Sequence, residues 1–358
     1  PEPSDPREKR ELLRALLAKA GYETGTPQKL LAAVDAWRKD RLVPRKSIPQ
    51  LADAYIALLE EGTRKHVVPY LPASLHHVPR ANIQFLPIEN AWFSGSMNYV
   101  GRARNPDGSP RYEATYELNA ALEISVPEFA QLVSHEVVPG HVTNFALAQG
   151  LYVQGKLGFE GTVLTMSTRG AALSEGLANN AMLMAMGVKE IHELPDPDLQ
   201  AGMILGVLQD DAKNQSSWLT WREKRPQAEV AAVLRNEYLC SEERADKLSG
   251  AWGRHPLNGR MYLPAYRAGT EHVAELRRRH PPEVIRAPPQ APAGEGDPGA
   301  LQRLRPRRRG DDRAGPVERL RGSAAPRIGV LRGPTGGGTL STWPPSSVRS
   351  SPPWCSSR

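Results

Sequence analysis

The sequence predicts a mainly helical domain with a small β-sheet, an α+β fold, over residues 1–285. Apolar residues recur at helical spacing in residues 1–72 and again from about 125 onward. Between about 80 and 122 the apolar residues alternate instead, which favours strands. From 286 to 358 the chain is rich in Arg, Pro and Gly and poor in core-forming residues. We therefore expect that part to be a disordered tail.

Local signals place the elements within this domain. In the N-terminal part, Thr26 and Pro27 predict one helix start, and Pro49 lies near another. Residues 82–86 and 112–118 predict two strands, and residues 92–99 a further strand or a glycine-opened loop. A capping box at Ser125 and Glu128 predicts a helix over about 125–149. Further helices are expected at 171–186 and 199–212.

The strand expected just before the 125–149 helix suits a hydrolase, because an exposed edge strand can bind an extended peptide by backbone pairing. No apolar run reaches the length of a transmembrane segment. The two cysteines exclude a disulfide framework and a Cys-based metal site. The first residues lack the apolar core of a signal peptide, but the chain begins at Pro1, so a leader could be missing. The sequence slightly favours the cytoplasm as the compartment. It does not indicate the oligomeric state.

The formal charge of +7 is concentrated in the tail, which has 12 Arg, no Lys and 5 acidic residues from Ala287 onward. The other 34 basic and 34 acidic residues balance. The domain therefore lacks the broad positive surface that specific nucleic-acid binding requires. The bias of the tail also resembles GC-rich DNA translated in a wrong frame. Resequencing the 3′ end of the gene tests this frame-shift hypothesis.

The candidate site begins with His135, Glu136 and His141 in the segment SHEVVPGH. Two imidazoles can hold a zinc ion, and a neighbouring carboxylate can accept a proton from the water that the metal activates. In the usual HExxH pattern the two histidines are four positions apart and share a helix face. Here they are six positions apart, about 600° around a straight helix. Pro139 must kink the helix and Gly140 must tolerate the bend to bring His141 back. The alternative is a polar patch on a kinked helix.

A catalytic zinc ion needs a third protein ligand, and Glu175 is the best downstream candidate. It is a lone acid in an apolar segment that we expect to be buried, so its charge needs a partner. That partner could be a metal ion, or alternatively an arginine such as Arg169. The adjacent acids Asp210 and Asp211 are interpreted as solvated charge, because neighbouring positions point to different faces of a helix.

The segment HEVVPGH resembles the HExxPGH signature of the domain-of-unknown-function 885 family, bacterial zincin-like proteins presumed to be metallopeptidases. Its later motifs, EGWALYxE and PGQALSYxxG, correspond here to residues 175–182 and 263–269, so the resemblance covers roughly residues 80–275. The matching residues are Glu175, Gly176, Ala178, Tyr266 and Gly269, whereas Leu177, Asn179, Asn180 and Met182 depart from the pattern. The chain thus resembles a divergent member of this family.

The resemblance implies a zincin-like fold in which His135, His141 and Glu175 bind Zn²⁺ and Glu136 acts as general base. It favours Tyr266 as the donor to the oxyanion, with His255 or Tyr262 as weaker candidates. The predicted function is a zinc-dependent peptide hydrolase with a peptide substrate. The alternatives are a non-catalytic metal- or peptide-binding protein on the same scaffold and, more weakly, a basic-tailed nucleic-acid-associated protein.

Overall fold

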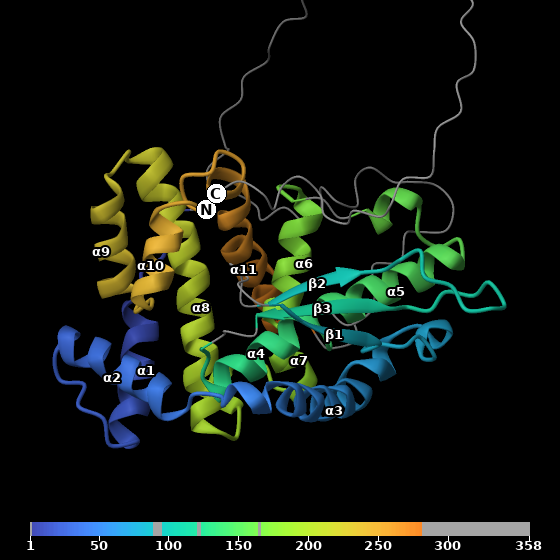
Figure 1. The fold of residues 1–358 in the computed structure, drawn as a ribbon, viewed down its shortest axis with the longest axis horizontal. Helices are drawn as coiled ribbons and strands as arrows, with labels where there is room; N and C mark the ends of the chain where they lie inside the picture. Colours follow the sequence, from blue (N-terminus) through green and yellow to red (C-terminus); the bar gives the residue numbers. More distant parts are fainter. Residues whose placement is uncertain (1, 89–94, 120–122, 164–165, 281–358) are drawn as a thin grey trace, which may run out of the picture. The chain divides into compact units, whose positions relative to one another are not determined.

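The computed structural model describes residues 2–88, 95–119, 123–163 and 166–280 (Figure 1). All of these residues belong to one unit of the chain, Pro1–Glu295. The tail predicted for residues 286–358 lies outside the described residues. Most of the described chain is helical and it contains one three-stranded sheet, so the predicted α+β fold is confirmed. None of the helices described is both long enough and apolar enough to cross a bilayer.

The α-helices, in chain order, are α1 (Arg7–Lys19), α2 (Pro27–Asp40), α3 (Ile48–His66), α4 (Val126–Glu136), α5 (His141–Val153), α6 (Arg169–Asn179), α7 (Ala181–Met186), α8 (Pro197–Ser217), α9 (Gln227–Glu237), α10 (Glu242–Ser249) and α11 (Leu263–Arg279). The strands are β1 (Ile83–Ile88), β2 (Gly95–Tyr99) and β3 (Ala114–Asn119). Short 3-10 segments lie at Arg45–Ser47, Val68–Tyr70, Ala73–Leu75, Phe159–Thr162 and Ile191–Glu193, and π-helical segments at Trp218–Arg222 and Asn258–Tyr262.

The three N-terminal helices form as their start signals predict. The hydroxyl of Thr26 accepts from the backbone N–H of Lys29, and Pro27 occupies the first turn of α2. Pro49 likewise lies in the first turn of α3. The apolar faces of α1 and α2, with Leu13 and Trp37 fully buried, pack against α8.

The sheet has the order β1-β3-β2, with β1 parallel and β2 antiparallel to β3. The strands predicted at 82–86 and 112–118 are both present, as β1 and β3. For residues 92–99 the sequence allows a strand or a loop, and residues 95–99 form the strand β2, whereas residues 92–94 lie outside the described part. The strand before the metal-site helix is β3, which is paired on both sides. The prediction that it offers a free edge is therefore wrong, and among the strands that the structure describes β1 and β2 are the edge strands. Alternate residues of β3, Ala114 and Tyr116, are fully buried under the helices.

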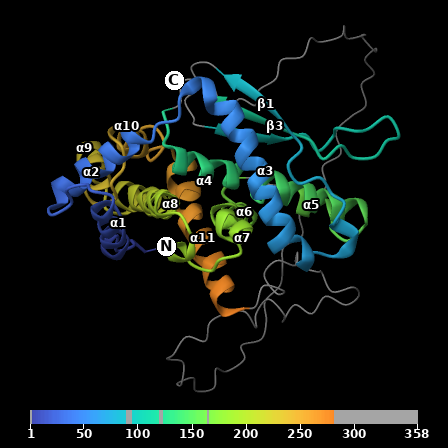
Figure 2. The same cartoon turned by 90° about the horizontal axis from the view of Figure 1, so that it is seen from below.

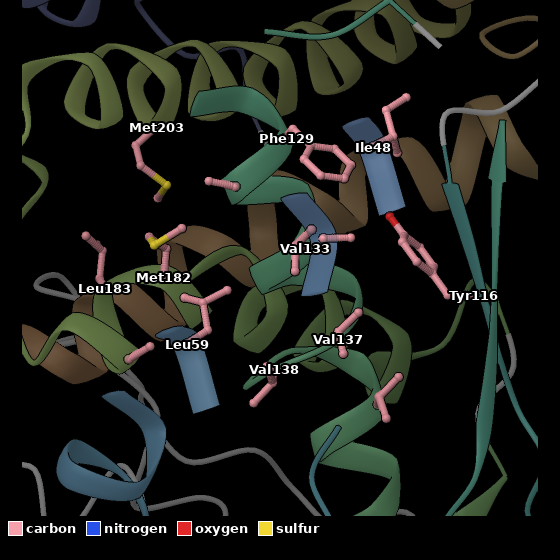
Figure 3. Close-up of a cluster of buried hydrophobic side chains, with 14 of the residues drawn as sticks. Ile48, Leu59, Tyr116, Phe129, Val133, Val137, Val138, Met182, Leu183 and Met203 are labelled. Atoms are coloured by element: carbon pink, nitrogen blue, oxygen red, sulfur yellow. The ribbon is translucent and has the colours of Figure 1, made fainter. Parts of the chain in front are cut away.

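The helix predicted over about 125–149 is two helices, α4 and α5. Ser125 caps α4 by accepting from the backbone N–H of Glu128, as expected. The helix then ends at Glu136, because Pro139 cannot continue the backbone ladder. Val137 and Val138 in the connection are fully buried in the main core (Figure 3). Burial of each valine contributes about 1.5–3 kcal/mol, which holds the break in place.

The segment predicted as one helix over 171–186 is also divided, into α6 and α7. The side-chain amide of Asn180 donates to the backbone carbonyl of Gly176, which ends α6 locally. The helix predicted at 199–212 is longer than expected and forms α8.

Helix α8 runs through the middle of the helical part and packs against α1, α4 and α11 (Figures 1 and 2). Helix α11 in turn packs against α6 at very short range. A Cβ at Gly269 would overlap the carbonyl oxygen of Ala172, and one at Gly176 would overlap the carbonyl oxygen of Gly269. The two glycines thus allow the backbones of α6 and α11 to touch, which fixes the position of α11 over α6.

We expect Gly269→Ala to lower the free energy of unfolding by about 1–3 kcal/mol or more, because backbone atoms cannot yield to the new methyl group. Urea unfolding followed by circular dichroism measures the loss. Gly25→Ala is the matched control, since nothing lies within 4 Å of a Cβ at Gly25. Equal stability of the two variants would contradict the close crossing of α6 and α11.

Candidate metal centre

The break between α4 and α5 brings the two histidines of the motif together. His135 lies in the last turn of α4, and His141 is the first residue of α5. Their ring centroids are 4.7 Å apart and their planes are nearly perpendicular, at 86°. The predicted return of His141 toward His135 is confirmed, although it occurs through a break rather than through a bulge within one helix.

Gly140 is the residue that this tight return requires. A Cβ at this position would overlap the carbonyl oxygens of His135 and Ser134. The backbone at Gly140 therefore passes directly against the end of α4, which only glycine permits. In the first turn of α5, the backbone N–H and the hydroxyl of Thr143 both donate to the backbone carbonyl of Val137, at 3.2 and 3.3 Å. These hydrogen bonds tie the start of α5 to the connection that precedes it.

Glu175 of α6 meets both histidines and is 4% exposed, so its expected burial is confirmed. Its Oε2 lies 3.4 Å from Nε2 of His135 and 3.7 Å from Nε2 of His141. Its Oε1 accepts a 2.5 Å hydrogen bond from the hydroxyl of Tyr262. The alternative partner Arg169 is exposed at the start of α6. The carboxylate therefore accepts a hydrogen bond from a phenol and lies beside two imidazoles.

One oxygen of this buried carboxylate has no hydrogen-bond partner among the described residues. Glu175 Oε2 is fully enclosed, and both nearby imidazole nitrogens are too distant or poorly aligned for a hydrogen bond. A buried acceptor without a donor is costly by about 1–3 kcal/mol, and more when it is charged. A cation placed between Oε2 and the two Nε2 atoms would remove this cost.

The separations between Oε2 of Glu175 and the two imidazole nitrogens fit a tetrahedral metal ion. Ligand bonds of about 2.1 Å at a tetrahedral angle place two ligand atoms about 3.4 Å apart. The separations of 3.4 and 3.7 Å from Oε2 agree with that value, and one ligand atom from each residue lies within 4.8 Å of the others. Two imidazoles and one carboxylate form a donor set typical of a catalytic site with an open position.

The charges at this centre are strongly coupled. Burial lowers the pKa of His135, but the contact with Glu175 and the charge of Glu136 outweigh burial and raise that pKa to about 8. Burial acts to raise the pKa of Glu175, but the contacts with His135 and His141 hold it well below its usual range. Glu175 is thus an anion at neutral pH whose charge is balanced by positive charge at the same point.

Glu136 and two tyrosines border the centre. Glu136 Oε1 lies 4.0 Å from Nε2 of His135, the atom that faces Glu175. The ring of Tyr266 packs edge-on against Tyr262 at 5.2 Å, and Nζ of Lys213 lies 3.3 Å from the centroid of Tyr266. Burial, followed by the charge of Glu175, raises the pKa of both phenols, so both hydroxyls are protonated donors at neutral pH.

The structure thus places Tyr262, ranked below Tyr266 from the sequence, in direct contact with Glu175. The third candidate donor, His255, is exposed, and its Nδ1 accepts from the backbone N–H groups of Leu257 and Asn258. That ring nitrogen is therefore used locally to cap the π-helical turn.

Two polar residues of α6 that the sequence analysis did not assign to the site contact the histidines on the side away from Glu175. Asn179 Oδ1 lies 2.8 Å from Nδ1 of His135, and Ser174 Oγ lies 3.1 Å from Nδ1 of His141. Their signal in the sequence is that both are polar residues within an otherwise small and apolar helix. In both histidines, therefore, Nε2 faces Glu175 and Nδ1 forms a hydrogen bond with a residue of α6, which is typical of metal-binding histidines.

The prediction that Asp210 and Asp211 are solvated is wrong, because they are 5% and 2% exposed. They lie on α8, which is packed on several sides, so both faces of the helix at this point are covered. Asp210 pairs with Lys213, whereas Asp211 pairs with Lys9 and Arg267. Each buried charge has its own cationic partner, which the sequence could not reveal.

Comparison with known proteins identifies the fold but no family. No protein-family model matches the chain, and no curated protein matches it. A solved structure of a "putative lipoprotein" from Colwellia psychrerythraea is 15% identical with a TM-score of 0.54, covering 78% of this chain and 46% of that chain. A "putative lipoprotein of unknown function" from Shewanella oneidensis is 14% identical with a TM-score of 0.53, covering 76% and 48%. At this identity the likeness concerns the fold alone, and the chain spans about half the length of these structures.

Proposed function

We propose that the chain is a zinc-dependent peptide hydrolase in which His135, His141 and Glu175 hold the metal ion. The observation that carries this proposal is the buried Oε2 of Glu175, which faces Nε2 of both histidines and finds no hydrogen-bond partner in the part of the chain that the structure describes. The same donor set could hold other divalent cations, and zinc is proposed because two imidazoles with one carboxylate are characteristic of its hydrolytic sites. Zinc bound there would supply Lewis acidity, which lowers the pKa of water and polarises a carbonyl group.

Glu136 is the proposed general base. Its carboxylate lies 4.0 Å from Nε2 of His135, beside the point where the three ligand atoms converge. In amide hydrolysis it would accept the proton of the attacking water and deliver it to the leaving amine. The single O–H of Tyr262, which donates to Oε1 of Glu175 here, would turn away from it to donate to the oxygen on which negative charge develops.

The proposed substrate is a peptide bound in extended form along an edge of the sheet. β2 is an edge strand, and it contacts both α4 and α5, the helices that carry the histidines. A peptide paired with such an edge receives backbone hydrogen bonds that are independent of its sequence. This position would bring a peptide bond close to Glu136 of α4.

We further propose that the chain is a divergent, zincin-like relative of the domain-of-unknown-function 885 family. The HExxPGH segment supports this relation, and so do the physical roles of two shared glycines. Gly176 and Gly269 allow α6 and α11 to touch, which brings Tyr262 onto Glu175. The departures at Asn179 and Asn180 keep the relation distant.

The purified full-length chain should contain about one zinc ion per chain by metal analysis. Digests of a peptide library should show cleavage that a chelator abolishes and added zinc restores. We expect Glu136→Gln to retain the metal and to lower the cleavage rate by at least about 10²–10⁴-fold, because only the proton acceptor is lost.

Glu61→Gln, a matching change at an exposed position of α3, is the control and should leave cleavage unchanged. Retained activity in Glu136→Gln would refute the assigned base. Bound zinc without any chelator-sensitive cleavage would favour the alternative function, a non-catalytic metal- or peptide-binding protein.

The two tyrosines can be separated by a matched pair of variants. Tyr262→Phe should lower kcat by about 10²-fold, because it removes the hydroxyl proposed to donate to the developing oxyanion. Tyr266→Phe should lower kcat by less than about 10-fold, since the phenyl ring keeps its packing on Tyr262 and Lys213. Steady-state kinetics on one cleaved peptide gives both values. A larger loss for Tyr266→Phe would restore Tyr266 as the oxyanion donor.

A further inference from the structure

Behind His135 lies a buried polar network that joins α6, α8 and α11. The side-chain amide of Asn179 donates to Oδ2 of Asp210 at 2.6 Å and to Oγ1 of Thr270 at 2.8 Å. Oδ1 of Asp210 accepts from Nζ of Lys213 at 2.9 Å. On its other side, Asn179 meets Nδ1 of His135 through Oδ1. Asp210 and the ring of His135 are thus connected through a single amide group.

The carboxylate of Asp210 decides which way this amide points. An ionised carboxylate only accepts hydrogen bonds, and Asp210 forms an ion pair with Lys213, whose Nζ lies 2.9 Å from its Oδ1. If the amide of Asn179 were turned over, its oxygen would face Oδ2 of Asp210 at hydrogen-bond distance with no proton between them. The amide nitrogen must therefore face Asp210, and Oδ1 must face His135.

The orientation of the amide in turn fixes the proton on the imidazole. Because Oδ1 of Asn179 can only accept, Nδ1 of His135 must donate and so carries the hydrogen. In the neutral ring this leaves the lone pair on Nε2, the nitrogen 3.4 Å from Oε2 of Glu175. His141 has no such constraint, since its Nδ1 faces the hydroxyl of Ser174, which can donate or accept.

We infer that Asn179 and Asp210 are positioning residues that hold His135 in the tautomer able to bind a metal through Nε2. This inference rests on the proposed function for its purpose, but the tautomer itself can be measured without activity. The arrangement interposes an amide between the carboxylate and the histidine. It therefore orients the ring without placing a further negative charge against it, beside those of Glu175 and Glu136.

The decisive variant is Asp210→Asn, which is nearly isosteric. The new amide can donate toward Asn179, so the amide of Asn179 can turn over and present its N–H₂ to His135. His135 would then carry its hydrogen on Nε2, which faces Glu175, and would lose its ability to bind metal there. We expect the Nε2–H form to become populated and the affinity for zinc to fall by about 10–100-fold.

Two-bond ¹H–¹⁵N correlation spectra of the histidine rings report the tautomer, with His135 assigned by its absence in His135→Gln. The spectra are recorded with zinc bound, and also without metal at about pH 9.5, where the ring is neutral. Zinc affinity is measured by competition with a chromogenic chelator.

Asp211→Asn is the matched control, because Asp211 is the adjacent buried acid of α8 but pairs with Lys9 and Arg267. It should leave both the tautomer and the zinc affinity unchanged, even if stability falls. An unchanged His135 tautomer in folded Asp210→Asn would overturn the inference. If Asp210→Asn fails to fold, Asn179→Leu decides: it removes the acceptor, so a His135 that stays wholly Nδ1–H would also overturn it. Absence of zinc binding in the wild type would refute the proposed function alone, since the metal-free spectra still test the tautomer.

Discussion

The arrangement of the centre depends on a buried carboxylate of which only one oxygen accepts a hydrogen bond from a described residue. Glu175 is enclosed by α4, α5, α6 and the turn before α11, and within the described ranges one of its oxygens lacks a hydrogen-bond donor. Such a group is expensive to keep in a protein interior unless positive charge lies beside it. The two imidazoles lie where they can supply that charge as cations, or share it with a bound metal ion. The break at Pro139 and the close approach at Gly140 together bring His141 to this carboxylate, and the crossing of α6 with α11 brings Tyr262.

Three glycines are required in this structure because backbone segments come into direct contact at their positions. Gly140, Gly176 and Gly269 each lie where a methyl group would overlap a carbonyl oxygen of another segment. Carbonyl oxygens belong to the backbone and cannot rotate away as a flexible side chain can. The distances between ligand atoms are consequently set by contacts between main chains, which are stiffer than contacts between side chains. A centre built this way is preformed, so a metal ion would have little rearrangement to drive.

Sequence patterns predicted the parts of this structure that depend on local chemistry. Helical spacing, the caps at Thr26 and Ser125 and the alternation in the strands each follow from a few neighbouring residues, and each is confirmed. The division of the 125–149 segment was half predicted, because proline forbids continuation but does not say whether the chain bends or stops. The burial of Asp210 and Asp211 was missed, since it depends on α1 and α11 packing against α8 from distant parts of the chain. Periodicity on one helix cannot report how many sides of that helix are covered.

The same limit explains why Asn179 read as a mere departure from a family pattern. Its role depends on Asp210, 31 positions away, and on Thr270, 91 positions away, and neither spacing leaves a mark in the sequence. The direction of every hydrogen bond in such a chain, however, is fixed by one member that can only accept. Here that member is the carboxylate of Asp210, which forms an ion pair with Lys213. From it the direction of each following hydrogen bond is forced, through the amide of Asn179 to the ring of His135. The chemistry available at Nε2 of His135 is therefore decided by an ion pair on a different helix.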